Sequence, residues 1–150
     1  DYKKTEEIIS CLIDVVSKNG SLLLNVGPKA DGTLPEKDIE LLNALGEWMD
    51  INGEGIYETS FWKKSGEGPT VTEEGHFTDV LEHSFTSEDF RFTYKNGCIF
   101  AFSMKWPEDG VVRIRTFGKK SKTLKESFVM SKFLAPLRDV NFNYVMNICQ

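Results

Sequence analysis

Apolar residues recur at the spacing of an amphipathic helix in two stretches near the start of the chain. The first stretch begins at Thr5, a candidate N-cap, and ends at Asn19-Gly20, a pair that favours the left-handed conformation that ends helices. The second begins at the capping box Thr33-Leu34-Pro35-Glu36, with Thr33 as N-cap, and ends at Asn52-Gly53. Its predicted apolar face contains Ile39, Leu42, Leu45 and Met49, together with Gly46, which would allow close packing.

An unbroken apolar run lies between the two predicted helices. Ser21–Val26 is too short for a helix and is closed by Gly27-Pro28. Such a run predicts a strand that is buried on both faces, as in a parallel sheet. Because a strand of this kind needs neighbours, and no strand pattern precedes it in this sequence, we expect its partner strands to lie upstream of Asp1. Residues 1–62 are therefore predicted to close a larger α/β domain.

The pattern changes beyond residue 62. Residues 63–86 have little periodicity and many Gly, Ser, Thr and Pro residues, which indicates a linker or irregular surface stretch with room for one or two short strands. Residues 87–150 are predicted to form a second, all-β domain.

The all-β prediction depends on three strands joined by tight turns. Phe90–Tyr94 alternates apolar and polar residues, Asn96-Gly97 is the strongest short signal for a type I′ hairpin, and Cys98–Met104 is the return strand. Trp106–Gly110 follows as a turn, and Val112–Arg115 alternates again as a third strand. Consecutive antiparallel strands of this kind predict a β-sandwich or a barrel.

The last thirty residues carry a weaker pattern. Ser127–Leu137 fits a helix or a strand, whereas the alternation from Val140 to Ile148 predicts a closing strand. Four lysines precede this region, and a solvated loop is the preferred interpretation over a phosphate site. They are Lys119, Lys120, Lys122 and Lys125.

Composition and charge narrow the classes of protein. A formal net charge of −5 with 27% charged residues gives no basis for nucleic-acid binding over the whole surface. No apolar run approaches the roughly 18 residues that a membrane helix needs. Cys11, Cys98 and Cys149 are odd in number and lack a C-x-x-C spacing, so neither a zinc site nor a redox pair is predicted. Cys11 and Cys98 are expected to pack as small apolar side chains, and the compartment stays open.

The loop after the predicted strand is the first candidate for chemistry. Gly27 and Gly32 have the spacing of a phosphate-binding P-loop, but Thr33 stands where that motif has lysine, and Pro28 removes an amide donor. A turn followed by a helix cap is the preferred interpretation. Asp31 lies where a barrel enzyme places catalytic groups, yet Asp-Gly is also ordinary turn chemistry, which we prefer.

The sequence contains no Ser-His-Asp order and no dinucleotide fingerprint. The other candidates for a functional site are therefore single polar or aromatic residues. Glu54 is interpreted, like Asp31, as structural. Asn25 would line a pocket floor or, preferably, tie neighbouring strands together. His76 and His83 have no third ligand in view, so no metal site is predicted. Four aromatic residues would suit stacking on sugars but more often fill a core or an interface: Trp48, Phe61, Trp62 and Trp106.

Four stretches of the sequence resemble the α-L-fucosidases of glycoside hydrolase family 29. Leu12–Pro35 resembles the segment that closes the catalytic barrel of the family, and Leu41–Trp62 fits the helix and exit that follow. Phe85–Phe102 and Trp106–Gly110 are similar to the opening of its C-terminal β-sandwich. The resemblance implies that Ser21–Val26 is the last strand of a (β/α)8-like barrel, covered by the two helices and followed by an antiparallel β-sandwich.

The resemblance also implies a function for a longer parent protein. Family members are retaining enzymes in which an Asp attacks the anomeric carbon of fucose and a second carboxylate, usually Glu, protonates the leaving oxygen. Both come from the barrel upstream of this segment, so no catalytic residue is assigned here and this chain alone is expected to be inactive. No metal or cofactor is implied. The implied partners are fucosylated glycans, and secreted, periplasmic or lysosomal locations are typical of the family, with the bacterial cytoplasm also open.

Two alternatives stay open at this point. In one, the β-rich part acts alone as a non-catalytic carbohydrate-binding or assembly module. In the other, the chain is a degenerate fragment without activity. Neither nucleic acid nor a membrane is expected as a partner.

Overall fold

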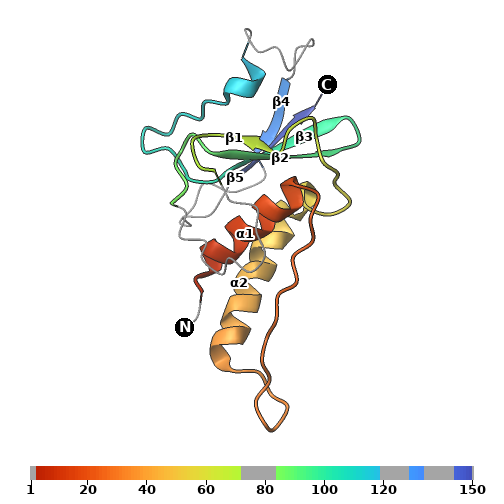
Figure 1. Cartoon of the computed structure of the whole chain (residues 1–150), viewed down its shortest axis with the longest axis vertical. Coiled ribbons are helices and arrows are strands. Elements are labelled where there is room, and N and C mark those ends of the chain that lie inside the picture. The colour runs from red at the N-terminus through yellow and green to blue at the C-terminus, as the bar shows by residue number, and fades with distance from the viewer. Residues whose placement is uncertain (1–2, 72–83, 119–128, 134–143, 150) are drawn as a thin grey trace.

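The computed structural model describes residues 3–71, 84–118, 129–133 and 144–149 (Figure 1). Two helices lie against one face of an antiparallel sheet. The helical elements are α1 (Thr5–Ser17), α2 (Glu36–Asn52) and the short 3-10 helices η1 (Gly53–Gly55) and η2 (Arg115–Phe117). The strands are β1 (Gly66–Glu67), β2 (Phe90–Lys95), β3 (Cys98–Ser103), β4 (Val129–Phe133) and β5 (Tyr144–Cys149).

Both long helices begin at residues other than the predicted caps. The N-cap of α1 is Lys4, one residue before Thr5. α2 begins at Glu36, and Thr33 does not cap it, because the Asp31 carboxylate accepts both the Thr33 N–H (2.9 Å) and the Thr33 hydroxyl (2.7 Å). A short acidic side chain two residues earlier therefore outcompetes the helix for the predicted capping group.

The Asn-Gly pairs at the ends of the two long helices adopt different conformations. Asn19 has φ 65°, and the Gly20 N–H closes a bond of 2.9 Å onto the last turn of α1, as in a Schellman motif, so this stop is confirmed. The second helix also ends where predicted, at Asn52, but the expected left-handed residue is absent there, since Gly53 has φ −60° and the chain continues into η1. This continuation carries the backbone to the sheet, where Gly55 O accepts the Thr93 hydroxyl (2.7 Å).

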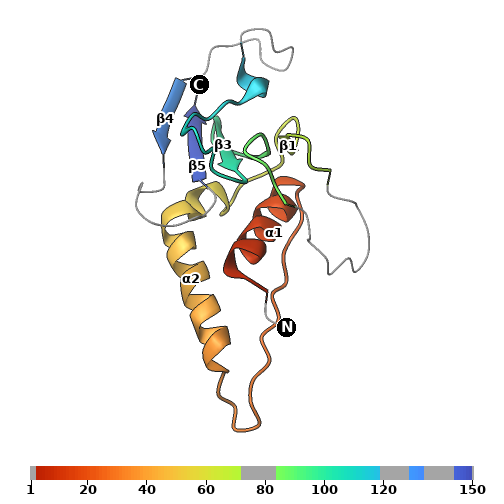
Figure 2. The same cartoon turned by 90° about the vertical axis from the view of Figure 1, so that its left-hand side faces the viewer.

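The predicted doubly buried strand is not formed in the described chain. Residues 21–26 are extended but unpaired, and no backbone–backbone hydrogen bond joins residues 21–28 to the rest of the described chain. Leu23 is 94% exposed. The physical reason is that a strand needs a neighbour for its amide groups, and the sheet of this chain lies elsewhere. The segment runs beside α2 down to the loop at residues 27–33 (Figure 1, Figure 2).

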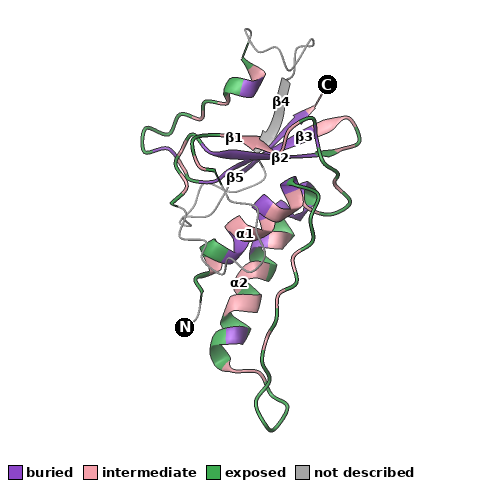
Figure 3. Cartoon of the chain, viewed as in Figure 1, coloured by how far each residue is buried: buried purple, intermediate pink, exposed green. Residues whose placement is uncertain are grey.

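Helix α2 projects beyond the sheet and packs mainly near its C-terminal end. Trp48 is buried, and Leu45 and Met49 pack against the same core. Ile39 is 44% exposed, although it was predicted on the buried face. A side chain at Gly46 would meet no atom within 4 Å, so the predicted close packing there is not observed. Figure 3 shows that much of the projecting part of α2 and the loop beside it are exposed.

The sheet has the strand order β1-β2-β3-β5-β4, and each neighbouring pair is antiparallel. β2 and β3 form the predicted hairpin, with Asn96 (φ 50°) and Gly97 (φ 83°) both left-handed, as a type I′ turn requires. β5 confirms the predicted closing strand over its described part. Within Ser127–Leu137, β4 shows that a strand rather than a helix forms.

The third predicted strand does not form. Residues 111–114 are irregular, although Val112 and Ile114 are half-buried and Arg113 is exposed, as the alternation predicts. Both edges of β3 are occupied, one by β2 and the other by β5, so the segment has no free edge beside its predecessor. It packs on a face of the sheet instead. The described strands make one sheet, and the β-sandwich stays a prediction.

Two hydrophobic cores cover the two faces of the sheet, because successive strand residues point to opposite sides. The core on the helix side consists of Ile9, Ile13, Trp48, Phe100, Phe102, Met104 and Val145. The core on the other side consists of Trp62, Phe90, Phe92, Ile99, Ala101, Met146 and Ile148. The helix-side core therefore contains residues of both predicted units, 1–62 and 87–150.

A buried ion pair joins α1 to the sheet. Arg91 Nε donates to Asp14 Oδ1 at 2.5 Å, and both side chains are almost fully buried. Lys18 Nζ lies 2.8 Å from Asp14 Oδ2. Burial raises the pKa of Asp14, but the hydrogen bonds from Lys18 and Arg91 outweigh burial and hold this pKa below its ordinary value. The carboxylate is therefore charged, and it anchors α1 to β2.

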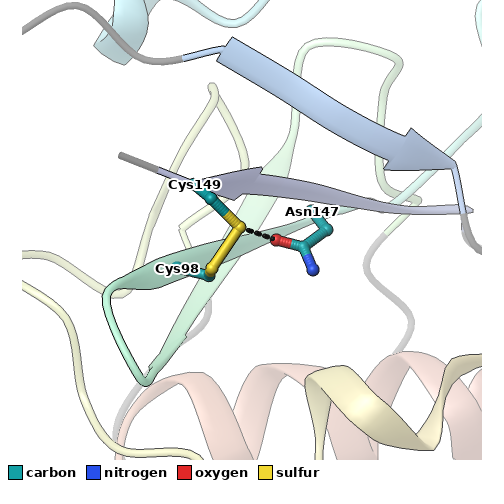
Figure 4. Close-up of a disulfide and its surroundings, with 3 residues drawn as sticks. All are labelled: Cys98, Asn147 and Cys149. Atoms are coloured by element: carbon teal, nitrogen blue, oxygen red, sulfur yellow. Dashed lines mark hydrogen bonds between the residues drawn. A yellow bond between two sulfur atoms is a disulfide. The ribbon is translucent and has the colours of Figure 1, made fainter.

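Cys98 and Cys149 form a disulfide, which corrects the prediction that Cys98 is an unpaired apolar side chain (Figure 4). The two residues lie directly opposite each other in the register of β3 and β5, with Cα atoms 4.1 Å apart. Asn147 Oδ1 lies 3.0 Å from Cys149 Sγ. The pair is separated by 51 residues and only the strand register brings it together, so the sequence did not reveal it. Cys11 is free and half-buried.

Candidate functional site

The loop between α1 and α2 is a closed turn rather than an open cradle for a ligand. The Gly32 N–H donates to Lys29 O (2.9 Å), and the Lys29 N–H donates to Thr33 O (2.7 Å). Gly32 has φ 85°, a value that glycine adopts without strain. Because these amides are bonded within the loop, they do not form a phosphate cradle. The turn is confirmed as the better interpretation of this glycine pair.

The two acidic candidates are separated by the length of α2. Asp31 lies in the exposed turn before the helix, and the hydrogen bonds from Thr33 hold its pKa below the ordinary value. Glu54 is exposed in η1, after the helix. A helix of 17 residues is about 25 Å long. The carboxylates of a retaining glycosidase stand about 5–5.5 Å apart, so Asp31 and Glu54 are not such a pair.

The remaining polar candidates do not form a site in the described chain. Asn25 is exposed in the unpaired segment, so both of its predicted roles, at a pocket floor or between neighbouring strands, stay predictions. His76, His83 and the lysines from 119 to 125 lie outside the described residues. Among the side chains that the structure describes, no three of His, Cys, Asp or Glu are grouped to hold a metal ion. No helix of the described ranges is long and apolar enough to cross a bilayer.

The four aromatic candidates have three different environments. Trp48 and Trp62 are buried, one in each hydrophobic core. Phe61 is 48% exposed. Trp106 is half-buried and lines a groove. Trp106 is therefore the aromatic candidate that is both held by its surroundings and open to a ligand.

The groove beside Trp106 has a volume of about 1020 Å³ and lies at one end of the sheet. Its lining residues come from three segments: residues 64–69 around β1, residues 86–88 before β2, and residues 105–118 after β3. The last two segments meet because Phe90 and Ser103 are paired at that end of the hairpin. The Asn96-Gly97 turn and the disulfide lie at the opposite end of the β2–β3 hairpin.

Glu67 of β1 holds one wall of the groove in place. Its carboxylate accepts the backbone N–H of Arg115 (2.6 Å) and of Thr116 (2.7 Å), and also the Thr116 hydroxyl. A carboxylate that accepts backbone N–H groups forms charge-assisted bonds, which are stronger than neutral ones. The segment around η2 is thus fixed to β1.

Asp89 holds a second wall in place. Its fully buried carboxylate accepts the N–H and the hydroxyl of both Thr70 and Thr86, at 2.7 to 3.0 Å. Gly68 has φ 129° and passes so close to Asp89 that a side chain would not fit there. Burial raises the pKa of Asp89, but the hydrogen bonds from Thr86 and Thr70 outweigh burial and hold this pKa below its ordinary value.

Trp106 stands at the start of a turn that is itself tied down. The Asp109 carboxylate accepts the Val111 N–H (3.0 Å) and an Arg113 N–H (2.8 Å). These hydrogen bonds hold the pKa of Asp109 below its ordinary value. The sequence identified Trp106 and the turn but not the groove, because its walls come from segments that are distant along the chain. The arrangement is suited to binding a polar ligand.

Comparisons with known proteins agree on one group of enzymes. Residues 1–54 match the family model described as α-L-fucosidase. The chain is 37% identical over 110 residues to the plasma α-L-fucosidase of Homo sapiens, a match that covers 73% of this chain and 20% of that protein. It is 34% identical over 116 residues to the human tissue α-L-fucosidase, covering 77% and 21%.

The similarity extends to solved structures. The chain matches the crystal structure of Thermotoga maritima α-fucosidase in complex with fucose with a TM-score of 0.60 and 30% sequence identity. This match covers 99% of this chain and 31% of that chain. The chain spans about one fifth of the length of the curated relatives that it matches.

Proposed function

We propose that this chain, which is similar to the α-L-fucosidases in its family-model match and in its relatives, is the C-terminal part of a retaining exo-α-L-fucosidase, which removes terminal α-linked L-fucose from glycans. In this proposal Ser21–Val26 is the last strand of a (β/α)8-like barrel, and α1 and α2 cover it. Residues 63–86 connect this segment to an accessory β-sandwich that includes the sheet.

The exposure of Leu23 is the observation that carries the proposal. A leucine that is 94% exposed, in an extended segment whose amides are unpaired, has the properties of a strand whose neighbours are elsewhere. Burying one such side chain is worth about 1.5–3 kcal/mol, so neighbouring strands would stabilise this conformation. The half-buried Leu22 and Leu24 lie on the alternate positions, as expected for a β-like backbone.

The proposed reaction needs two carboxylates, and in this proposal both come from outside these 150 residues. A nucleophilic carboxylate oxygen bonds to the anomeric carbon of fucose while the glycosidic bond breaks, and a carboxylic acid gives its proton to the leaving oxygen. Water then attacks the anomeric carbon, the same second group takes a proton from that water, and the nucleophilic carboxylate is released. The length of α2 separates Asp31 from Glu54, so these two are not this pair, and the proposal places both catalytic groups in the barrel outside these 150 residues.

Hydrolysis of 4-nitrophenyl α-L-fucoside tests this proposal. The isolated chain is expected to release no nitrophenol above the buffer rate, whereas the longer protein that contains it releases nitrophenol with retention of configuration. The corresponding β-galactoside serves as the control substrate. Turnover of the fucoside by the isolated chain, or its absence from the longer protein, would overturn the proposal.

A further inference from the structure

The groove beside β1 is polar but electrically balanced. Its lining holds four cationic side chains and four carboxylates, so its formal charge is zero. The cationic residues are Lys64, Lys105, Arg113 and Arg115, and the acidic residues are Glu67, Glu88, Glu108 and Asp109. A phosphate, a nucleic acid or another polyanion needs an excess of cations, which this lining does not offer. The charge balance favours a neutral ligand.

The charged side chains of the groove hold one another in position. Arg115 Nη2 donates to Glu88 Oε1 (3.0 Å), and this pair joins the segment after β3 to the segment before β2. The Arg113 guanidinium is bonded to Asp109 at 2.8 Å. A guanidinium and a carboxylate that share one bond keep further donors and acceptors for a ligand. Hydroxyl groups both donate and accept, so a polyhydroxylated ligand matches such a mixed lining.

Trp106 adds a flat apolar surface to this polar lining. A sugar ring has a face of C–H groups and an edge of hydroxyls, and an indole beside charged side chains offers a partner for each. The groove volume of about 1020 Å³ lies at the upper end of the roughly 300–1,000 Å³ usual for small-molecule sites. Because Glu67 and Asp89 fix the walls, little ordering remains to oppose binding.

We propose that this groove binds a neutral oligosaccharide, which stacks on Trp106 and is hydrogen-bonded by Arg113, Arg115 and Glu88. The expectation that the oligosaccharide is fucosylated rests on the proposed function. The proposal that the groove binds a neutral oligosaccharide does not depend on it. The groove would retain the glycan on the sheet, at the opposite end of the molecule from the loop at residues 27–33 (Figure 1, Figure 2).

Titration of the chain with 2′-fucosyllactose and with lactose tests the proposal. The chain has three tryptophans, so ¹⁵N-labelled indoles give three N–H signals, and Trp106→Phe assigns one of them. We expect the Trp106 signal to shift saturably, with a Kd on the order of 1 mM. The Trp48 and Trp62 signals are internal controls, because both rings are buried in the cores and are expected to stay in place.

Two variants separate stacking from a general surface effect. The affinity of the variants is measured by isothermal titration calorimetry, which needs no indole at position 106. Trp106→Ala is expected to weaken binding about tenfold, while Phe61→Ala, which truncates an exposed aromatic residue outside the groove, leaves the Kd unchanged. Unchanged Trp48 and Trp62 signals in Trp106→Ala show that the variant is folded, so a lost affinity then reports on the groove alone.

Three results would overturn the proposal. They are the absence of a saturable Trp106 shift up to 20 mM sugar, equal shifts of all three indoles, and binding of inorganic phosphate or a sulfated disaccharide in preference to lactose. Equal affinity for lactose and 2′-fucosyllactose would support oligosaccharide binding in the groove and would contradict the expectation that the ligand is fucosylated. These signals are read without turnover, so their failure is distinguishable from a failure of the proposed hydrolysis.

Discussion

Individual carboxylates decide the local structure at several places in this chain. Asp31 takes the hydroxyl of Thr33 away from the start of α2, Glu67 fixes the segment around η2, and Asp89 fixes the two threonines beside β1 and β2. In each case a carboxylate accepts backbone N–H groups that are not bonded within a helix or strand. Some of these bonds join residues that are far apart in the sequence, so they hold the long connecting segments against the sheet.

Asp89→Asn is expected to destabilise the chain by about 1–3 kcal/mol at pH 7, because an amide cannot accept all four hydrogen bonds that the carboxylate accepts. The lowered pKa of Asp89 provides stability that is complete above the ordinary aspartate pKa of about 4 and is lost as pH falls through the lower folded value. The advantage of Asp89 over Asn should therefore shrink between pH 5 and pH 2. Urea unfolding of both proteins across this range measures it.

Asp109→Asn is the matched control for this experiment, because Asp109 is exposed and its bonds are confined to its own turn. Because solvent screens its bonds, this substitution is expected to change stability much less than Asp89→Asn does between pH 7 and pH 2. A constant difference between the native chain and Asp89→Asn from pH 7 to pH 2 would contradict the assigned role of the carboxylate.

At the residue scale, the sequence predicted the conformations that depend on adjacent residues alone. Asn19 and the pair Asn96-Gly97 adopt left-handed conformations where expected, because their short side chains or missing side chains tolerate them. The cap at Thr33 was wrong because Asp31 competes for the same hydroxyl. The left-handed conformation expected at the Asn52-Gly53 stop was wrong, although α2 ends there, because the backbone that follows continues as a 3-10 helix toward the sheet.

At the scale of elements, register and burial decide which contacts matter. The ion pair between Asp14 and Arg91 is buried, whereas that between Arg113 and Asp109 is exposed on both sides. A buried charge that loses its partner cannot be hydrated, and an exposed one can. Losing one partner of the buried pair should therefore lower the free energy of unfolding more than losing one partner of the exposed pair.

Arg91→Ala is expected to destabilise the chain by about 3 kcal/mol, because Asp14 stays buried without the guanidinium that is bonded to it. Arg113→Ala removes an exposed pair and is expected to cost less than about 1 kcal/mol. Chemical denaturation of the two variants at pH 7 compares them directly. Equal losses of stability would show that α1 is not anchored to β2 as described.

The disulfide gives a second prediction at this scale. Thiol titration of the unreduced, denatured chain is expected to find one reactive cysteine of the three, which is Cys11. Replacing Cys98 and Cys149 together by Ala is expected to lower the free energy of unfolding by about 4 kcal/mol, because the bond closes a loop of about 50 residues. Cys11→Ala is the control. Three reactive thiols without reductant would contradict the pairing.

The sequence predicted the elements that are specified locally and missed those that depend on neighbours. The β2–β3 hairpin was predicted because its turn and its alternation lie within sixteen consecutive residues, 89–104. The strand expected at Val112–Arg115 does not form, because β5, which comes later in the chain, occupies the edge of β3. Neither the disulfide nor the groove can be read from spacing, since both depend on how distant segments align.

At the scale of the whole molecule, α2 and the extended segment beside it project from a sheet that does not cover them (Figure 3). The apolar pattern of Ser21–Val26 indicated a strand with neighbours on both sides, and these residues are extended but without pairing partners in the described chain. The sequence therefore predicted the need of this segment for neighbouring strands, and its resemblance to the fucosidases suggests which strands they are.

The most direct test of this account is Leu23→Asp measured in two contexts, the isolated chain and the longer protein, with the exposed Val71→Asp as control. In the isolated chain both variants are expected to change stability by less than about 0.5 kcal/mol. In the longer protein Leu23→Asp would bury an unpaired charge, so we expect at least about 3 kcal/mol of destabilisation and loss of fucoside hydrolysis, with Val71→Asp unchanged. Full stability and activity of Leu23→Asp in the longer protein would contradict the account.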